Sequence, residues 1–193
     1  MSTPSPTVAP ATGRLGVLTV GLGAVASTLI AGVELAKRGL GAPIGSLAQM
    51  DTIRLGKRTD NRNPMIKDFV PLARLEDIVW GAWDPFPDDA YVAATRAGVL
   101  ETGKHLEAIS DTLREIRPMK AAFERNYVKN IDAENIMGKI SKREMLNAIR
   151  ADINKFRDEK KVDRVVMIWC ASTEIFIEPG PQHQNLEAFE KAI

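Results

Sequence analysis

The sequence predicts an α/β fold built on a mainly parallel sheet, and three observations lead to this prediction. Apolar strand-like runs alternate with helix-like segments along the chain. The run at 165–169 is almost continuously apolar, which is typical of a strand buried on both faces. The first apolar run, at 15–20, passes through a glycine-rich turn into a helix-like segment, so it has the order of a strand–turn–helix unit.

The remaining elements follow the same alternation. We expect a strand at 15–20, a helix at 24–38, a second strand within 45–55, a loop at 58–64, a buried strand at 77–84, helices at 88–97 and 104–117, a long helix at 141–160 and a central strand at 162–169. Gly39 and Gly41 terminate the first helix, and Pro118 ends the helix at 104–117. We expect the three tryptophans, Trp80, Trp83 and Trp169, to lie in the core.

The long helix has the clearest local signals. Ser141 is a plausible N-cap, and Glu144 stands three residues later at the capping-box position. Apolar residues then recur every three or four positions at Met145, Ile149, Ile153 and Phe156. This spacing predicts a helix with one face buried against the sheet.

The composition indicates one domain of ordinary globular type. The chain has 193 residues, of which 45% are hydrophobic and 26% charged, and this length is enough to bury a core. Residues 1–14 are rich in proline and small residues and are expected to be a disordered tail, which leaves 15–193 as the folded domain.

Charge and cysteine content exclude several classes of function. The formal net charge of +1 gives no electrostatic case for binding nucleic acid or an anionic membrane. The single cysteine, Cys170, excludes an internal disulfide framework and suits a reducing cytoplasm. Two histidines and one cysteine give no cluster at the spacing of metal ligands.

The glycine-rich turn carries the most specific chemistry. Gly21, Gly23 and Ala26 fit the spacing of a dinucleotide-binding fingerprint. The first glycine would allow the tight turn, the second would let the backbone approach a pyrophosphate, and Ala26 would let the helix pack closely on the strand. Ser27 and Thr28 add hydroxyl groups to the first turn of the helix, whose positive end would face the phosphates.

The same region allows a different interpretation. The run from Leu15 to Val33 carries no charge, follows Arg14, and contains an Ala-Val-Ala sequence at 24–26 that resembles a signal-peptidase site. A membrane-anchored or exported protein is therefore an alternative. A buried strand followed by a buried helix gives the same uncharged string, and the glycines dilute its hydrophobicity.

Polar residues follow two further strands, at the edge where ligands of open α/β sheets bind. Asp84 could accept hydrogen bonds from a ribose or simply form an Asp-Pro turn. Ser172 and Thr173 could contact the nicotinamide side or cap a helix, and Cys170 is better explained as a small buried residue than as a nucleophile.

The acid expected about 20 residues beyond the glycines is not clear. Glu34 sits inside the predicted helix, and Asp51 comes late. Recognition of the ribose, and with it the choice between NAD and NADP, stays open at this point.

The three strand ends taken together resemble the myo-inositol-1-phosphate synthases. The resemblance rests on the segments at 20–29, 81–84, 148–156 and 165–174, with Arg117-Pro118 and the Tyr-Val-Lys at 127–129 in support. It covers essentially residues 15–193 in order, and the segments together are far more specific than the glycine pattern alone.

The resemblance implies a Rossmann-like, doubly wound fold and a tightly held NAD. It implies conversion of glucose 6-phosphate to inositol phosphate, in inositol and phospholipid biosynthesis, by oxidation at C5, enolisation, aldol closure and reduction by the same cofactor. It places the following residues at the NAD site: Gly21, Gly23, Ala24, Ser27 and Thr28 at the pyrophosphate, Asp84 at the end of the buried strand, and Ala171, Ser172 and Thr173 on the family's Thr-Ala-Asn-Thr segment. Cys170 and Ser172 replace the Thr and Asn of that segment, which puts their side-chain contacts in doubt.

The resemblance also implies what the chain lacks. The family's catalytic lysines and its tetramerisation sheet lie beyond the position of Ile193, so no catalytic residue is assigned and the sheet is expected to be C-terminally truncated. We therefore expect an N-terminal fragment of a cytoplasmic, homotetrameric synthase. A stand-alone dinucleotide-binding module without catalysis is the alternative.

Overall fold

A four-stranded parallel sheet forms the centre of the protein. The computed structural model describes residues 12–128, 130–171 and 176–192. The strands are β1 (Leu15–Val20), β2 (Ile78–Asp84), β3 (Met119–Lys120) and β4 (Arg164–Trp169), and their order in the sheet is β3-β2-β1-β4. The predicted α/β class with a mainly parallel sheet is confirmed.

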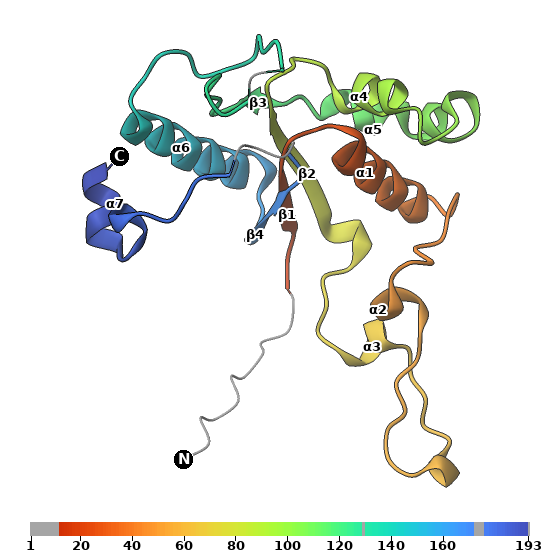
Figure 1. The fold of residues 1–193 in the computed structure, drawn as a ribbon. Helices are drawn as coiled ribbons and strands as arrows, with labels where there is room; N and C mark the ends of the chain where they lie inside the picture. Colours follow the sequence, from red (N-terminus) through yellow and green to blue (C-terminus); the bar gives the residue numbers. More distant parts are fainter. Residues whose placement is uncertain (1–11, 129, 172–175, 193) are drawn as a thin grey trace, which may run out of the picture.

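Helices cover both faces of this sheet, as the doubly wound class requires (Figure 1). The helices α1 (Ala24–Lys37), α4 (Ala90–Ala97) and α5 (Ser110–Glu115) pack on one face. The long α6 (Lys142–Lys160) packs on the other. A short C-terminal helix, α7 (Leu186–Ala192), follows a 3₁₀ turn at Pro181–His183.

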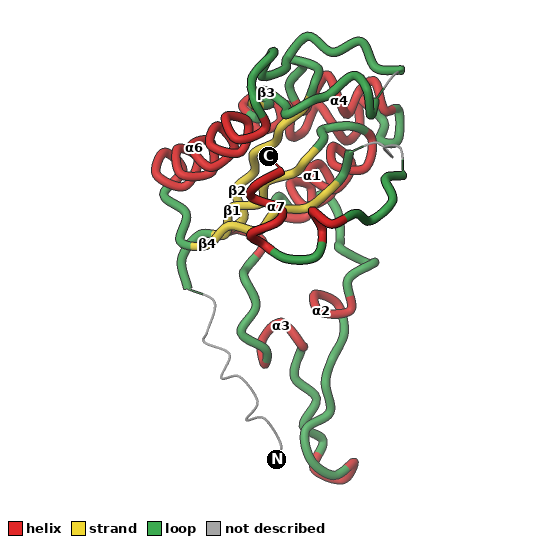
Figure 2. The backbone as a smooth tube through the Cα atoms, turned by 60° about the vertical axis from the view of Figure 1, so that its left-hand side comes forward, coloured by secondary structure: helices red, strands yellow, loops and turns green. Residues whose placement is uncertain are grey.

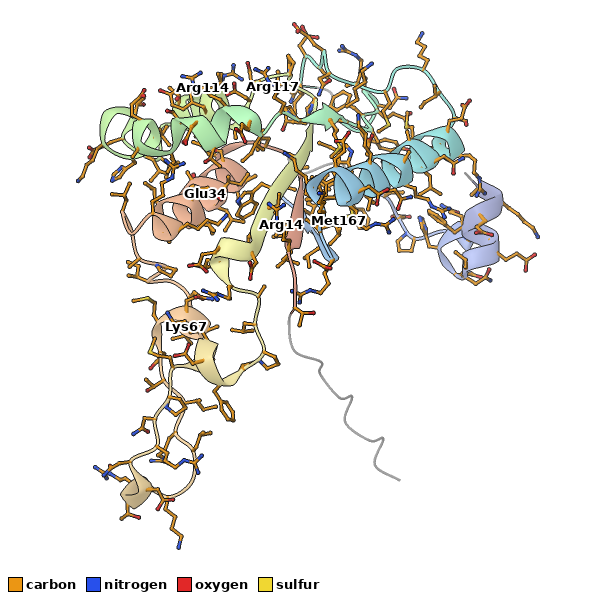
Figure 3. The ribbon with its side chains drawn as sticks, turned by 180° about the vertical axis from the view of Figure 1, so that it is seen from behind. Arg14, Glu34, Lys67, Arg114, Arg117 and Met167 are labelled. Carbon is orange, nitrogen blue, oxygen red and sulfur yellow. The ribbon has the colours of Figure 1, made fainter. Side chains whose placement is uncertain are left out.

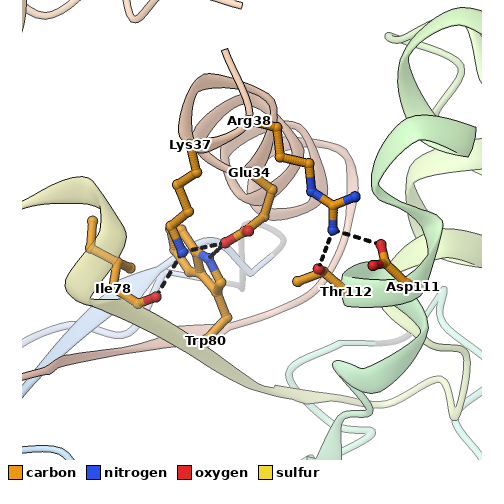
Figure 4. Close-up of polar contacts among 7 residues, drawn as sticks. All are labelled: Glu34, Lys37, Arg38, Ile78, Trp80, Asp111 and Thr112. Carbon is orange, nitrogen blue, oxygen red and sulfur yellow. Dashed lines mark hydrogen bonds and ion pairs between the residues drawn. The ribbon is translucent and has the colours of Figure 1, made fainter. Parts of the chain in front are cut away.

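A buried polar network joins α1 to β2 on the first face (Figure 4). Glu34 is only 5% exposed, and its carboxylate accepts hydrogen bonds from Trp80 Nε1 at 2.8 Å and Lys37 Nζ at 2.6 Å. Lys37 also donates to the carbonyl oxygen of Ile78 at 2.8 Å. A buried carboxylate is tolerated because it is paired and hydrogen-bonded, so Glu34 has a structural explanation.

Phe156 of α6 fills the space left by glycines in two neighbouring strands. A Cβ atom at Gly16 would lie 2.6 Å from Phe156 Cε1, and one at Gly81 would lie 2.9 Å from Phe156 Cε2 and 2.7 Å from Leu18 Cδ2. The predicted apolar face of α6 thus meets the sheet where the strands carry no side chain. The capping box of α6 is also confirmed, because Ser141 Oγ accepts from the Glu144 N–H and Glu144 Oε2 accepts from the Ser141 N–H.

The expected second strand within 45–55 is wrong. That segment belongs to an arm, residues 39–77, which extends away from the sheet and carries the single-turn helices α2 (Leu47–Met50) and α3 (Ile66–Phe69) (Figure 2). Its backbone pairs with the returning half of the same arm, since Ile53 N donates to Pro64 O and Leu55 N to Arg62 O. The segment thus pairs within the arm and does not join the sheet.

Two other segments differ from expectation in detail. The helix predicted at 104–117 is divided into a π-helical turn at Thr102–Leu106, a 3₁₀ turn at Glu107–Ile109 and α5. Leu106, Ile109 and Leu113 are fully buried across these three turns. The short β3 has no periodicity that sequence could reveal.

The last strand, β4, lies at the edge of the described sheet rather than at its centre. Trp169 is 65% exposed and Met167 50% exposed, whereas Trp80 and Trp83 are buried. The expectations of a central strand and of a core position for Trp169 are therefore wrong. An apolar run indicates that a strand can be buried on both faces. It does not show whether another strand or helix among the described residues covers it.

Residues 15–33 form a strand, a turn and most of α1 rather than one long helix. Among the described residues, no helix is both long enough and apolar enough to cross a membrane. Residues 1–11 of the expected tail lie outside the described residues. Arg14 at its end, labelled in Figure 3, donates through its backbone N–H to Asp163 Oδ2 at 2.8 Å and through Nη1 to Lys160 O at 2.7 Å.

We predict that Gly81→Ala destabilises the protein by about 1–3 kcal/mol, because the added methyl group overpacks the contact with Leu18 and Phe156. Urea denaturation of the intact protein measures this change. The cost should be smaller in a Phe156→Leu background, where the ring is gone. Equal costs in both backgrounds would contradict this explanation of the strand glycines.

Candidate functional site

A groove of about 530 Å³ lies at the carboxyl ends of β1, β2 and β4. The glycine loop after β1 and the residues after β2, β3 and β4 line it. In Figure 1 this is the upper edge of the sheet, where the chain passes from β1 into α1. The groove therefore lies where open α/β sheets bind their ligands.

Gly21 makes the turn at the end of β1, and its conformation requires glycine. Its φ of +97° lies in a region that residues with side chains rarely adopt. A Cβ atom there would also lie 2.9 Å from the Cα of Ala171, which follows β4. The Gly21 N–H donates to Trp83 O at 2.8 Å, so the turn is fixed between its two neighbouring strands.

Gly23, in contrast, is not required by the fold. Its φ of −75° suits any residue, and a Cβ atom added to it would meet nothing within 4 Å. It is the N-cap of α1, and no side chain caps the helix there. Open space above a helix N-terminus without a side-chain cap fits the close approach of an anionic pyrophosphate, so the loop fits a dinucleotide.

Asp84 holds the glycine loop in place. Its side chain is buried, with Oδ2 accepting from the Leu22 N–H at 2.5 Å and Oδ1 accepting from the Phe86 N–H at 2.9 Å. Its carbonyl oxygen accepts from Asn135 Nδ2 at 2.9 Å. The carboxylate thus forms the Asp-Pro turn and also bridges the ends of β1 and β2, while it lines the groove.

The other residues expected at the site fall into three groups. Ala24 and Ala171 line the groove with the two glycines. Ser27 is fully buried with its hydroxyl directed to Ala24 O at 3.4 Å, and neither Ser27 nor Thr28 is among the lining residues. Ser172 and Thr173 lie outside the described residues.

Two acidic residues closer to the glycines in sequence were candidates for binding the ribose. Neither lines the groove. Glu34 is buried against Trp80, and Asp51 lies on the arm. The acid at the end of the second strand is Asp84. The arm lengthens the connection between β1 and β2, so a spacing counted along the sequence does not find this residue, although its place in the fold is the usual one.

Cys170 lines the groove at the end of β4. Its backbone N–H donates to Val20 O at 2.8 Å. Burial raises the pKa of its thiol above the ordinary value, which keeps it in the protonated, unreactive form at neutral pH. The sequence predicts a small buried residue rather than a nucleophile; in the structure Cys170 is only half-buried and packs against the core cluster beside α1.

Sequence reasoning missed the side of the groove formed by the β2–α4 connection and α4. Asp88 and Arg96 line it and form an ion pair at 2.6 Å, and the Arg96 guanidinium lies over the Phe86 ring at 6.0 Å from its centroid. The opposite side is apolar, with Ile149 of α6 and Met167 of β4, the latter labelled in Figure 3. A helix at 88–97 was expected, but the direction of its side chains depends on how it packs.

The fold and the loop together define a dinucleotide-binding domain of the Rossmann-like class. The family model described as myo-inositol-1-phosphate synthase matches residues 15–193, and the chain belongs to that family. The matched region is the family's NAD-binding domain, so the cofactor of this domain is NAD.

Individual relatives agree. The chain is 46% identical to inositol-3-phosphate synthase 1 of Bacteroides thetaiotaomicron over 187 residues, which is 96% of this chain and 43% of that protein. It is 29% identical to inositol-3-phosphate synthase of Trypanosoma brucei brucei, over 86% of this chain and 34% of that protein. The crystal structure of inositol-3-phosphate synthase from Caenorhabditis elegans superposes with a TM-score of 0.76 at 26% identity, covering 88% of this chain and 36% of that one. The chain thus spans less than half the length of these relatives.

We predict that Gly23→Val abolishes NAD binding but leaves the protein folded, because the branched side chain occupies the open space above the helix N-terminus. Gly21→Ala is the matched comparison. It should lower the midpoint of unfolding, because of its positive φ and its contact with Ala171. Calorimetric titration with NAD and urea denaturation separate the two effects, and a folded Gly23→Val protein that retains NAD would contradict the prediction.

We also predict that Cys170 alkylates slowly at neutral pH, with a rate that rises at a higher pH than in the unfolded protein. The sign follows from the raised pKa, since less thiolate is present in the folded state at any given pH. Mass spectrometry of the Cys170 peptide after timed iodoacetamide treatment measures the rate. NAD should slow it further, because the thiol lines the groove. A pH midpoint at or below that of the urea-unfolded chain would argue against this environment.

Proposed function

We propose that this chain is the NAD-binding part of an inositol-3-phosphate synthase that converts D-glucose 6-phosphate to 1D-myo-inositol 3-phosphate. The observation that carries the proposal is the glycine loop, with its open space at Gly23, in a member of the synthase family. The relatives named above are inositol-3-phosphate synthases. We further propose that the whole protein works as an NAD-dependent isomerase in the cytoplasm and as a homotetramer.

The residues of the chain have distinct roles in this proposal. Gly21 makes the turn, and Gly23 and Ala24 present backbone N–H groups to the pyrophosphate, with open space at Gly23. Asp84 fixes the loop, and Ser27 and Thr28 complete the first turns of the helix below it. Ala171 lines the groove after β4, and by the family resemblance it contacts the nicotinamide side together with Ser172 and Thr173, which lie outside the described residues. The bound NAD would supply reversible acceptance of a hydride from the sugar.

Enolisation needs a base, and the groove offers no free candidate among its described residues. Asp84 accepts two backbone N–H groups, Asp88 is paired with Arg96, and the raised pKa of Cys170 keeps its thiol protonated. Acid–base groups of this kind typically contribute about 10²–10⁴-fold to a rate. We therefore propose that the catalytic groups belong to the part of the relatives that residues 1–193 do not match.

The test is an assay of inositol phosphate formation from glucose 6-phosphate and NAD. The proposed whole synthase that contains this chain should form inositol phosphate. The polypeptide 1–193, assayed beside it, should not. Turnover by the polypeptide alone would show that its own residues perform the proton transfers. An intact protein that binds NAD but never forms inositol phosphate would instead favour a dinucleotide-binding module without catalysis.

A further inference from the structure

The side of the groove next to β2 contains a charge arrangement that the NAD-binding role does not explain. In dinucleotide-binding folds of this type, the acid at the end of the second strand and the residues near it face the adenosine ribose. Here these are Asp84, the connection at 85–89 and the following helix α4. A 2′-hydroxyl at this position distinguishes NAD, whereas a 2′-phosphate distinguishes NADP.

Three charged side chains line the described part of the groove, and all three lie on this side. Asp84 is committed to two backbone N–H groups. Arg96, the single cation among the described lining residues, is paired with Asp88 at 2.6 Å. The described lining therefore carries a net negative charge, although it contains the kind of residue that binds a phosphate.

Arg96 is well placed to recognise a phosphate if it were released. Its guanidinium lies over the ring of Phe86, which also lines the groove, and its side chain is 62% exposed. Arginine binds phosphate through paired hydrogen bonds, and a phosphate monoester carries about −1.5 to −2 charges at neutral pH. Asp88 occupies the guanidinium and adds a negative charge beside it. The neighbouring Asp89 has a different task, since it caps α4 by accepting from the Val92 N–H.

We propose that Asp88 is a specificity-determining residue that makes this groove select NAD over NADP, by neutralising Arg96 and repelling a 2′-phosphate. The inference rests on the binding of NAD in the groove and adds the basis of its selectivity. Selectivity arises here from an unfavourable interaction with the wrong cofactor, rather than from a contact that NAD alone makes.

The experiment compares the dissociation constants of NAD and NADP, measured by calorimetric titration of the intact protein. Asp88→Asn keeps the shape of the side chain and removes its charge. The affinity for NADP relative to NAD should rise about tenfold or more, and the increase should shrink at high salt. The double variant Asp88→Asn/Arg96→Gln should lose this increase in relative affinity for NADP, because the increase depends on the guanidinium that Asp88→Asn releases.

Two controls complete the design. Asp132→Asn removes an exposed acid that is paired with Arg125 at 3.3 Å outside the groove. It should leave the affinity for NADP relative to NAD unchanged. Arg96→Ala, which does not depend on the folding of an Asp88 variant, should lower the affinity for NADP relative to that for NAD, because Asp88 is then left without its partner. A ratio that stays the same in both Asp88→Asn and Arg96→Ala would overturn the proposal. Failure of the unmodified protein to bind NAD would instead overturn the assignment of the groove itself.

Discussion

The carboxylate of Asp84 is the interaction on which the geometry of the site depends. It joins the loop after β1 to the turn after β2 through one hydrogen bond to each, at 2.5 Å and 2.9 Å. A buried carboxylate that accepts two backbone N–H groups is well compensated for its loss of water. This bridge holds the left-handed turn at Gly21 against Ala171 and directs the N-terminus of α1 toward the groove. The helix end and the open space at Gly23 become a site only because this loop is fixed.

The helices on the two faces of the sheet are held by different kinds of contact, polar on one face and apolar on the other. On one face, Glu34 and Lys37 pair within α1 and link it to β2 through Trp80 and the carbonyl oxygen of Ile78. On the other, the Phe156 ring lies on the glycines of β1 and β2. The first arrangement fixes α1 on β2, and the second packs α6 against both β1 and β2. The strand therefore delivers its glycine turn to a defined place at the edge of the sheet.

The groove differs in character from one side to the other. The side near β2 and α4 is charged, and the side near α6 and β4 is apolar with Met167 and Trp169 well exposed. The relatives extend well beyond the region that this chain matches. The charged side lies on β2, α4 and the connection between them, where Asp88 and Arg96 form their ion pair.

The sequence by itself determined the α/β class, the strands at β1 and β2, the capped helix α6 and the glycine turn, because each depends on local signals. Alternating elements, the Ser141–Glu144 cap and a glycine with positive φ all act over a few residues. Only the tertiary structure decided that Asp84 is the acid of the second strand, that 45–55 belongs to an arm, and that Trp169 is exposed at a sheet edge. The ion pair between Asp88 and Arg96 beside the groove is likewise visible only in the tertiary structure. These features depend on which segments meet in space, and a spacing counted along the chain loses that information once an arm is inserted between two neighbouring strands.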